Sequence, residues 1–202
     1  MINLYKIFKR SFDIFFALFG LVLLSPIILL SYIVATFDTL SNGFFVQQRV
    51  GMNGYVFSVV KIKTMKSLAG ENSTITSSND VRITKSGIFF RKTKIDELPQ
   101  LWNILIGQMS FVGPRPDVPG YADRLQGKDR VILSVRPGIT GPAQLAYKNE
   151  EEILAKQDDM VKYNNEVIWP DKVAINMKYI ENYSFFRDLY YIWKTIVGSD
   201  VK

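Results

Sequence analysis

The chain has 202 residues, 48% of them hydrophobic, so it can bury one core of ordinary size but leaves little room for a second full domain. Its 25 Lys and Arg against 19 Asp and Glu give a net charge of +6, which suits an anionic partner such as nucleic acid, a phospholipid surface or a phosphorylated substrate. The absence of Cys and His excludes disulfides, Cys/His zinc sites, Cys nucleophiles and triads with a His base. Covalent or proton-transfer chemistry must therefore use Asp, Glu, Lys, Ser, Thr or Tyr, and a hard cation such as Mg²⁺ is the metal that suits these groups.

A run without formal charge extends from Ile14 to Phe37. As a helix at about 1.5 Å per residue, its roughly 24 residues reach about 36 Å, which is long enough to cross a bilayer. No small-residue cleavage site follows, so we expect a permanent anchor and not a cleaved signal peptide. Ser25 and Pro26 lie near the middle of the run, where proline removes a backbone donor and restricts the residue before it, so a kink is expected there.

Basic residues flank this run on both sides, and positive charge favours the cytoplasmic face of a membrane. Two arrangements fit the pattern about equally well. The helix could bend at Ser25 and Pro26 and return to the cytoplasmic side as a re-entrant helix, or it could span the bilayer as an ordinary kinked helix. The flanking residues are Lys6, Lys9 and Arg10 before the run, and Arg49, Lys61, Lys63 and Lys66 after it.

Two short strands rich in branched and aromatic residues are expected at residues 44–51 and 55–63. Met52, Asn53 and Gly54 between them form a turn signal, so the pair predicts a β-hairpin. The polar stretch at residues 70–80 is typical of a surface loop.

Two helices are expected near the C-terminus. Pro170 suits the first turn of a helix that carries Val173, Met177 and Ile180 at helical spacing. Ser184 is placed to cap a last helix with a wide apolar face. That helix could lie in the membrane interface or pack on the protein core, and the pattern does not choose between them.

The best place for chemistry is residues 91–102, where two adjacent carboxylates, Asp96 and Glu97, lie in a basic surround. Because proline is tolerated in the first turn of a helix, Pro99 predicts a helix that starts near Asp96. Both carboxylates would then lie at the positive end of the helix dipole, where Asp96 would stay ionised and phosphate is favoured. Alternatively, Thr93 and Asp96 match the Ser/Thr-x-x-acid capping pattern, in which case Asp96 would only close a helix end.

Several basic residues are candidates for binding phosphate, although each one alone could equally be a solvated surface charge. Arg115 stands out, because Pro114 and Pro116 fix the backbone on either side of it and aim its planar guanidinium. A second Gly/Pro-rich stretch follows at residues 136–142. The candidates are Lys61, Lys63, Arg91, Arg115, Arg136 and Lys148.

Eight pieces of the chain occur in an order that matches one known family. These pieces are Lys9-Arg10-Ser11-Phe12-Asp13, Ser25-Pro26, Gln48-Arg49-Val50-Gly51, Lys61-Ile62-Lys63-Thr64-Met65, Arg91 with Asp96-Glu97-Leu98-Pro99-Gln100-Leu101, Asn103, Met109-Ser110-Phe111-Val112-Gly113-Pro114-Arg115-Pro116, and Arg136-Pro137-Gly138-Ile139-Thr140-Gly141. They extend over most of the chain. In this order the sequence resembles the bacterial sugar transferase family, the monotopic polyprenyl-phosphate phosphoglycosyl transferases.

The resemblance implies a fold. It is a mixed α/β, mainly helical protein with an N-terminal re-entrant membrane helix in residues 1–40, broken at Ser25 and Pro26. A small cytosolic catalytic domain in residues 41–202 would follow, with a short β-hairpin and amphipathic helices that lie in the interface. The protein would reside on the cytoplasmic face of the bacterial inner membrane.

The resemblance also implies a reaction. Asp96 would be the nucleophile that attacks the β-phosphate of a nucleotide-sugar, and the phosphosugar would stay on Asp96 until polyprenyl phosphate takes it. Glu97 would assist proton transfer or metal placement, and Mg²⁺, held by Asp96, would neutralise the diphosphate. Arg91, Arg115 and Arg136 would add positive field at the transition state. The product would begin a capsule, O-antigen, exopolysaccharide or glycoprotein glycan.

The expected partners are a nucleotide-sugar with UDP as its nucleotide, polyprenyl phosphate and the lipid bilayer, with a homodimer left open. Nucleic acid is not expected, because the basic residues form no stripe with stacking aromatics. The chain has Pro142 where many relatives carry an aromatic residue and Lys148 where an arginine is familiar, so the sugar stays open. The competing hypothesis is a non-catalytic, membrane-tethered scaffold or pseudoenzyme, and the intact Asp96 and Glu97 pair argues against it.

Overall fold

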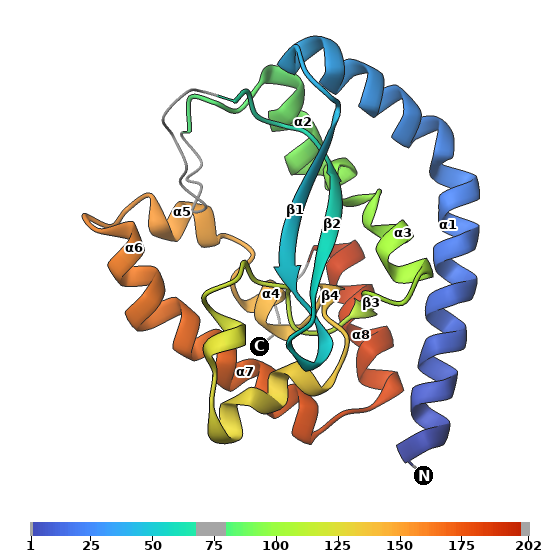
Figure 1. Cartoon of the computed structure of the whole chain (residues 1–202), viewed down its shortest axis with the longest axis vertical. Helices are drawn as coiled ribbons and strands as arrows, with labels where there is room; N and C mark the ends of the chain where they lie inside the picture. The colour runs from blue at the N-terminus through green and yellow to red at the C-terminus, as the bar shows by residue number, and fades with distance from the viewer. Residues whose placement is uncertain (1, 68–79, 199–202) are drawn as a thin grey trace.

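The computed structural model describes residues 2–67 and 80–198, with the side chains from residue 5 onward. Helices surround a long two-stranded hairpin, and the N-terminal helix runs along one side of the molecule (Figure 1). The loop predicted at residues 70–80 lies, apart from Asp80, outside the described residues.

Helix α1, Ile2–Thr39, continues without interruption through Ser25 and Pro26. Ser25 Oγ donates to the Val22 carbonyl (2.9 Å), and the ribbon curves over the top of the hairpin, as helices with an internal proline do (Figure 1). The segment Tyr5–Thr39 is long and apolar enough to cross a membrane, judged by length and composition. Many of its large apolar side chains are exposed, so the helix presents an extensive apolar surface.

The N-terminal half of α1 is tied to the rest of the protein through buried polar groups. Lys9 Nζ donates to the Val112 carbonyl (2.9 Å) and forms an ion pair with Asp188. Asp13, only 2% exposed, accepts a hydrogen bond from Ser110 Oγ (3.1 Å). Because buried charges are costly without partners, these contacts fix α1 against the domain.

The predicted hairpin is confirmed. Strand β1, Phe44–Val50, pairs antiparallel with β2, Val56–Ile62. The tight turn between them requires left-handed backbone at Asn53 (φ 59°) and Gly54 (φ 83°), the residue types that tolerate it. Inward-facing side chains of β2 pack on α1 and on helix α3, Gln100–Leu105, in a core of Ala17, Phe57, Val59, Leu101, Ile104 and Met109.

A second, smaller sheet joins the two Gly/Pro stretches. Strand β3, Ser110–Val112, pairs parallel with β4, Gly138–Thr140. A Cβ on Gly138 would lie 2.1 Å from the Gly113 nitrogen, and one on Gly113 would lie 2.3 Å from the Arg136 carbonyl oxygen. Only glycines therefore allow the two backbones to come this close.

The C-terminal helices agree largely with the sequence pattern. Pro170 lies in the first turn of α7, Trp169–Glu181, as predicted. Ser184 is the N-cap residue of α8, Phe185–Val197, although its side chain makes no capping hydrogen bond. Helix α8 packs on β3, β4 and α4 while Phe186, Trp193 and Ile196 stay exposed, so it serves the core and also presents an apolar surface. The remaining α-helices are α2 Lys85–Thr93, α4 Pro142–Ala146, α5 Glu150–Leu154, α6 Met160–Tyr163, α7 Trp169–Glu181 and α8 Phe185–Val197, and shorter 3₁₀ or π segments are Met52–Gly54, Ile95–Glu97, Ala122–Arg124, Gly127–Ser134 and Asn164–Ile168.

Candidate active site

The two adjacent carboxylates lie on a single 3₁₀ turn, Ile95–Glu97, between α2 and α3. Lys94 adopts a left-handed conformation (φ 59°) that ends α2, and α3 begins only at Gln100, with Pro99 as its N-cap residue. The prediction that a helix starts near Asp96 is therefore wrong. Pro99 takes the position before the helix, and the carboxylates occupy the connection.

The capping alternative is also wrong. Thr93 is the last residue of α2, and its hydroxyl donates back to the Phe89 carbonyl (2.8 Å). Asp96 Oδ1 is buried and makes no hydrogen bond within the described part of the chain. The Asp96 carboxylate is thus left with an acceptor atom that the protein does not use.

Glu97, in contrast, is held by two cations. It is 9% exposed, and its Oε1 lies 3.5 Å from Lys61 Nζ and 3.3 Å from Arg115 Nη2. Burial by itself raises the pKa of this carboxyl, but Lys61 and Arg115 outweigh it and bring the pKa down to about 2. Glu97 is therefore ionised throughout the physiological range.

The environment of Asp96 acts in the opposite direction. Burial, and then the negative charge of Glu97, raise the pKa of Asp96 to about 6, against the opposing influence of Lys61 and other cations. Asp96 therefore titrates close to neutral pH. A place at a helix start suggested instead that Asp96 would stay ionised well below neutral pH. Two neighbouring carboxyls with pKa values pushed apart are a common feature of catalytic sites.

The structure gathers three of the six predicted phosphate-binding residues around the turn. Lys61 and Arg115 contact Glu97, and Arg91 contacts Met65 Sδ and forms an ion pair with Glu151. Burial lowers the pKa of Lys61 to about 8, while the charge of Glu97 raises that of Arg115. Lys61 can thus exchange a proton near neutral pH, whereas Arg115 is a fixed cation.

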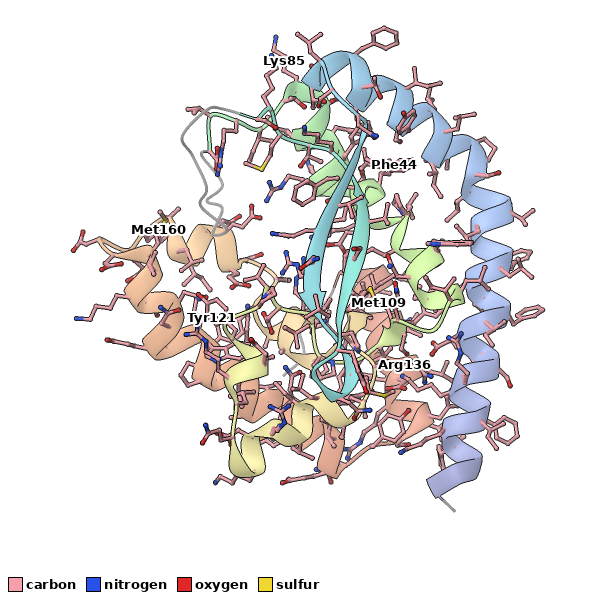
Figure 2. The ribbon with its side chains drawn as sticks, in the orientation of Figure 1. Phe44, Lys85, Met109, Tyr121, Arg136 and Met160 are labelled. Atoms are coloured by element: carbon pink, nitrogen blue, oxygen red, sulfur yellow. The ribbon has the colours of Figure 1, made fainter. Side chains whose placement is uncertain are left out.

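The other three lie elsewhere. Lys63 donates to Ser41 Oγ (2.8 Å), and Lys148 Nζ contacts the Gly198 carbonyl (3.4 Å) at the edge of the cleft described below. Arg136, labelled in Figure 2, donates through Nε to the Gly107 carbonyl (2.8 Å), which follows α3 in the chain. Arg136, like Arg115, lies next to a proline. Its position depends on the pairing of β3 with β4, however, and its guanidinium contacts the Gly107 carbonyl and not Glu97.

Two charged residues near the site were not predicted. Arg49 donates to the Pro116 carbonyl (3.1 Å), and burial, together with the charge of Arg115, lowers its pKa to about 10. Burial raises the pKa of Asp117 to about 6. The sequence did hold a signal for each, because Arg49 lies in one of the matched motifs and Asp117 directly follows Pro116.

A cleft of about 1070 Å³ opens beside this turn. Its two sides differ in chemistry. A charged end is formed by Arg91, Lys92, Lys94, Glu97, Arg115 and Asp117, and an apolar wall by Phe12, Phe16, Phe19 and Leu24 of α1 with Ile192 and Ile196 of α8. The cleft can therefore hold a ligand that has both a strongly anionic part and an aliphatic part.

The residues present fit Mg²⁺ in a specific way. Among residues 2–67 and 80–198, no three His, Cys, Asp or Glu side chains are grouped to hold a metal ion by themselves. Mg²⁺ commonly takes one or two carboxylates and completes its shell with substrate phosphates and water. The unpartnered Oδ1 of Asp96 offers one such ligand, so a cation would be shared with a phosphorylated substrate.

Comparison with known proteins agrees with this chemistry. The model of the bacterial sugar transferase family matches residues 4–199. The exopolysaccharide production protein ExoY of Rhizobium meliloti is 33% identical over 93% of this chain and 83% of its own length, and the sugar transferase EpsL of Bacillus subtilis 36% over 94% and 86%. The UDP-glucose:undecaprenyl-phosphate glucose-1-phosphate transferase of Klebsiella pneumoniae is 35% identical over 94% of this chain but only 39% of its own length. The chain thus belongs to the bacterial sugar transferase family.

Proposed function

We propose that this protein transfers a phosphosugar from a UDP-sugar to undecaprenyl phosphate through a covalent intermediate on Asp96. The observation that carries the proposal is the contrast on one turn: Oε1 of Glu97, which lines the cleft, contacts both Lys61 and Arg115, while the neighbouring Asp96 keeps a carboxylate oxygen that has no partner in the described part of the chain. A nucleophile must be ionised, and Asp96, with a pKa of about 6, is mostly ionised at neutral pH and has an oxygen that no group in the described part of the chain engages.

In the first step, an Asp96 oxygen forms a bond to the β-phosphorus, and the bond from that phosphorus to the bridging oxygen breaks. Uridine monophosphate leaves with the electron pair, and the phosphosugar remains as an acyl phosphate. Arg115 supplies fixed positive charge to the phosphoryl oxygens, where negative charge accumulates, and Lys61 adds to it when protonated. Glu97, with a pKa of about 2, holds these two cations in place and is not suited to deliver a proton.

In the second step, an oxygen of polyprenyl phosphate attacks the same phosphorus, and the bond to Asp96 breaks. This regenerates the carboxylate and yields a polyprenyl diphosphosugar. Asp96 would hold Mg²⁺, which would supply charge neutralisation to the diphosphate. The apolar wall from α1 and α8 would accommodate the first isoprene units of the acceptor, next to the reacting phosphate.

The proposal includes a re-entrant α1 that enters and leaves at the cytoplasmic face. Both ends of the helix pack on the same domain: Lys9 and Asp13 contact β3 and its neighbours, and Ala35 lies in a cluster with Ile62 and Phe90. A helix whose two ends contact one soluble domain is best accommodated with both ends on one side of the bilayer. Exposed apolar residues on α8 would then rest in the same interface.

The decisive experiment is turnover by the purified protein in nanodiscs with undecaprenyl phosphate, Mg²⁺ and a panel of UDP-sugars. We expect release of uridine monophosphate and, without the acceptor, a sugar-phosphate adduct on the intact protein by mass spectrometry. Asp96→Asn should abolish the adduct and lower turnover by about 10³-fold or more. The same substitution at exposed Asp158 serves as the control.

A scaffold or pseudoenzyme would behave differently in the same assay. It would bind a nucleotide-sugar without releasing uridine monophosphate across the whole panel. Turnover that survives Asp96→Asn would instead show that the protein is an enzyme but that Asp96 is not its nucleophile.

A further inference from the structure

A group of uncharged polar side chains also lines the cleft. Thr140, Gln144, Asn176 and Thr195 all line the cleft. The two threonine hydroxyls contact each other (2.6 Å). The amide oxygens Gln144 Oε1 and Asn176 Oδ1 are buried and have no hydrogen-bond donor in the part of the chain that the structure describes. Together with Asp96 Oδ1 they make up the buried side-chain acceptors in that part that lack a partner.

The orientation of Gln144 is set from its other side. Its Nε2 donates to the Gly113 carbonyl (3.1 Å) and lies 3.5 Å from the Gly138 carbonyl, so the amide nitrogen is turned toward the β3 and β4 connection. The amide oxygen is therefore left as an acceptor. Gly141 leaves room for it, because a Cβ there would lie 3.0 Å from Oε1.

Asn176 is conspicuous because of its neighbours on α7. It is 5% exposed, and charged or polar groups about one turn away on either side have partners: Lys172 pairs with Glu150 (2.6 Å), and Tyr179 donates to Asp188 (2.7 Å). Asn176 Oδ1 has none. A buried amide without a donor destabilises a fold, and an apolar residue of similar size would serve packing better. A structural role thus explains poorly why an asparagine occupies this buried position. A role in binding a ligand explains it well.

The chemistry of these two acceptors limits what they can bind. Neutral amide oxygens repel anions and accept hydrogen bonds, and a hydroxyl or an amide N–H is a complementary uncharged donor. Helices α4 and α7, which carry Gln144 and Asn176, pack against each other, so both acceptors can serve one ligand. Gln144 is also tied to Gly113, two residues before the phosphate-facing Arg115.

We propose that Gln144 and Asn176 form the subsite for the sugar ring of the nucleotide-sugar and accept hydrogen bonds from its hydroxyl or acetamido groups. This assignment rests on the proposed function. The subsite lies in the same cleft as the cations that receive the phosphates, which is where the sugar of a bound diphosphosugar must lie. The N3–H of a uracil base has the same donor chemistry, so the test separates the two sources.

The test measures kcat/KM for UDP-glucose, UDP-galactose and their N-acetylated counterparts, together with inhibition by uridine monophosphate, which lacks the sugar. Asn176→Leu removes one acceptor, and Gln144→Met removes one acceptor together with the Nε2 donor to Gly113, while both keep the size of the side chain. We expect each to lower kcat/KM for the best donor by about 3- to 10-fold, the effect of one neutral hydrogen bond, and to narrow the preference between donors. Inhibition by uridine monophosphate should not change.

Asn182→Leu, at the exposed end of α7, is the matched control and should leave all values unchanged. Unchanged donor preference in both cleft variants would overturn the subsite, and a parallel loss of inhibition by uridine monophosphate would assign these residues to the base instead. If Asn176→Leu lowers the unfolding temperature, the donor preference of Asn176→Ser is measured at reduced temperature instead. It decides whether Asn176 belongs to the sugar subsite. Failure of the proposed function differs from failure of the subsite, because in the first case the wild-type protein would turn over none of the donors.

Discussion

The two sides of the cleft are built on opposite principles. At the charged end the ionised groups are paired across different elements: Glu97 with Lys61 and Arg115, and Arg91 with Glu151. The wall from α1 and α8 offers aromatic and aliphatic side chains with no charge. The charged end fixes positive potential at one place, and the wall provides a non-directional surface along which a chain can lie. Binding specificity for a phosphate and tolerance toward a long aliphatic chain are thus separated in space.

Apart from the loss of Asp96 itself, the largest effect should come from removing the fixed cation at the charged end. Arg115→Met should lower kcat/KM by about 10²- to 10³-fold, because charge at the phosphoryl oxygens would lose its main counterpart. Arg115→Lys should recover only part of this, since an ammonium lacks the planar fork. Steady-state release of uridine monophosphate measures both, with exposed Arg124→Met as the control. Activity near the wild-type level in Arg115→Met would remove the charged end from the chemistry.

The next effect separates the two carboxylates. Because the charge of Glu97 contributes to the raised pKa of Asp96, Glu97→Gln should lower that pKa from about 6. Asp96 must be ionised to react, so activity is lost as pH falls through its pKa, and the acid limb of kcat/KM should move to lower pH. The plateau should fall by about 10- to 100-fold as Lys61 and Arg115 lose their anchor. An unchanged acid limb of kcat/KM in Glu97→Gln would mean that a group other than Asp96 controls the loss of activity at low pH. Exposed Glu166→Gln is the control.

A smaller effect is expected on the apolar wall. Phe19→Ser should raise KM for undecaprenyl phosphate by about 5- to 10-fold, since apolar area buried by the chain is lost, and should change KM for a short-chain polyprenyl phosphate much less. Phe15 is exposed on α1 but does not line the cleft, so Phe15→Ser is the matched control. Equal effects on long and short acceptors would show that the wall does not follow the lipid chain.

The smallest effect concerns the ion pair between Arg91 and Glu151. Glu151 is 45% exposed, so the pair is weak, but its carboxylate competes with substrate phosphates for the same guanidinium. Glu151→Gln should therefore lower KM for the nucleotide-sugar about 2- to 3-fold at low salt, and the gain should vanish at high salt. Exposed Glu181→Gln controls for net charge. A raised KM would instead mean that Glu151 helps to bind the substrate.

What could be predicted from the sequence was local. The hairpin follows from two strands rich in branched and aromatic residues and from a turn whose Asn53 and Gly54 tolerate positive φ, and the start of α7 follows from Pro170. The connection around Asp96 could not be predicted, because the left-handed Lys94 and the late start of α3 depend on how α2 and α3 pack together.

The positions of the arginines show the same limit. Arg115 and Arg136 lie in similar proline-rich settings, yet one reaches Glu97 and the other the Gly107 carbonyl. The difference arises from β3 and β4, whose three-residue lengths give no periodic signal. The unpartnered oxygens of Gln144 and Asn176 likewise appear only once distant helices are brought together.

The close approach of Gly113 and Gly138 has a practical consequence for exchanging parts between relatives. Since neither residue has room for a methyl group, the loop that presents Arg115 and the loop that begins at Arg136 form one interlocked unit. A chimera that transplants one loop without its counterpart would separate the guanidinium from Glu97 even though every charged residue is retained. A chimera that exchanges both loops together should therefore keep the contact between Arg115 and Glu97.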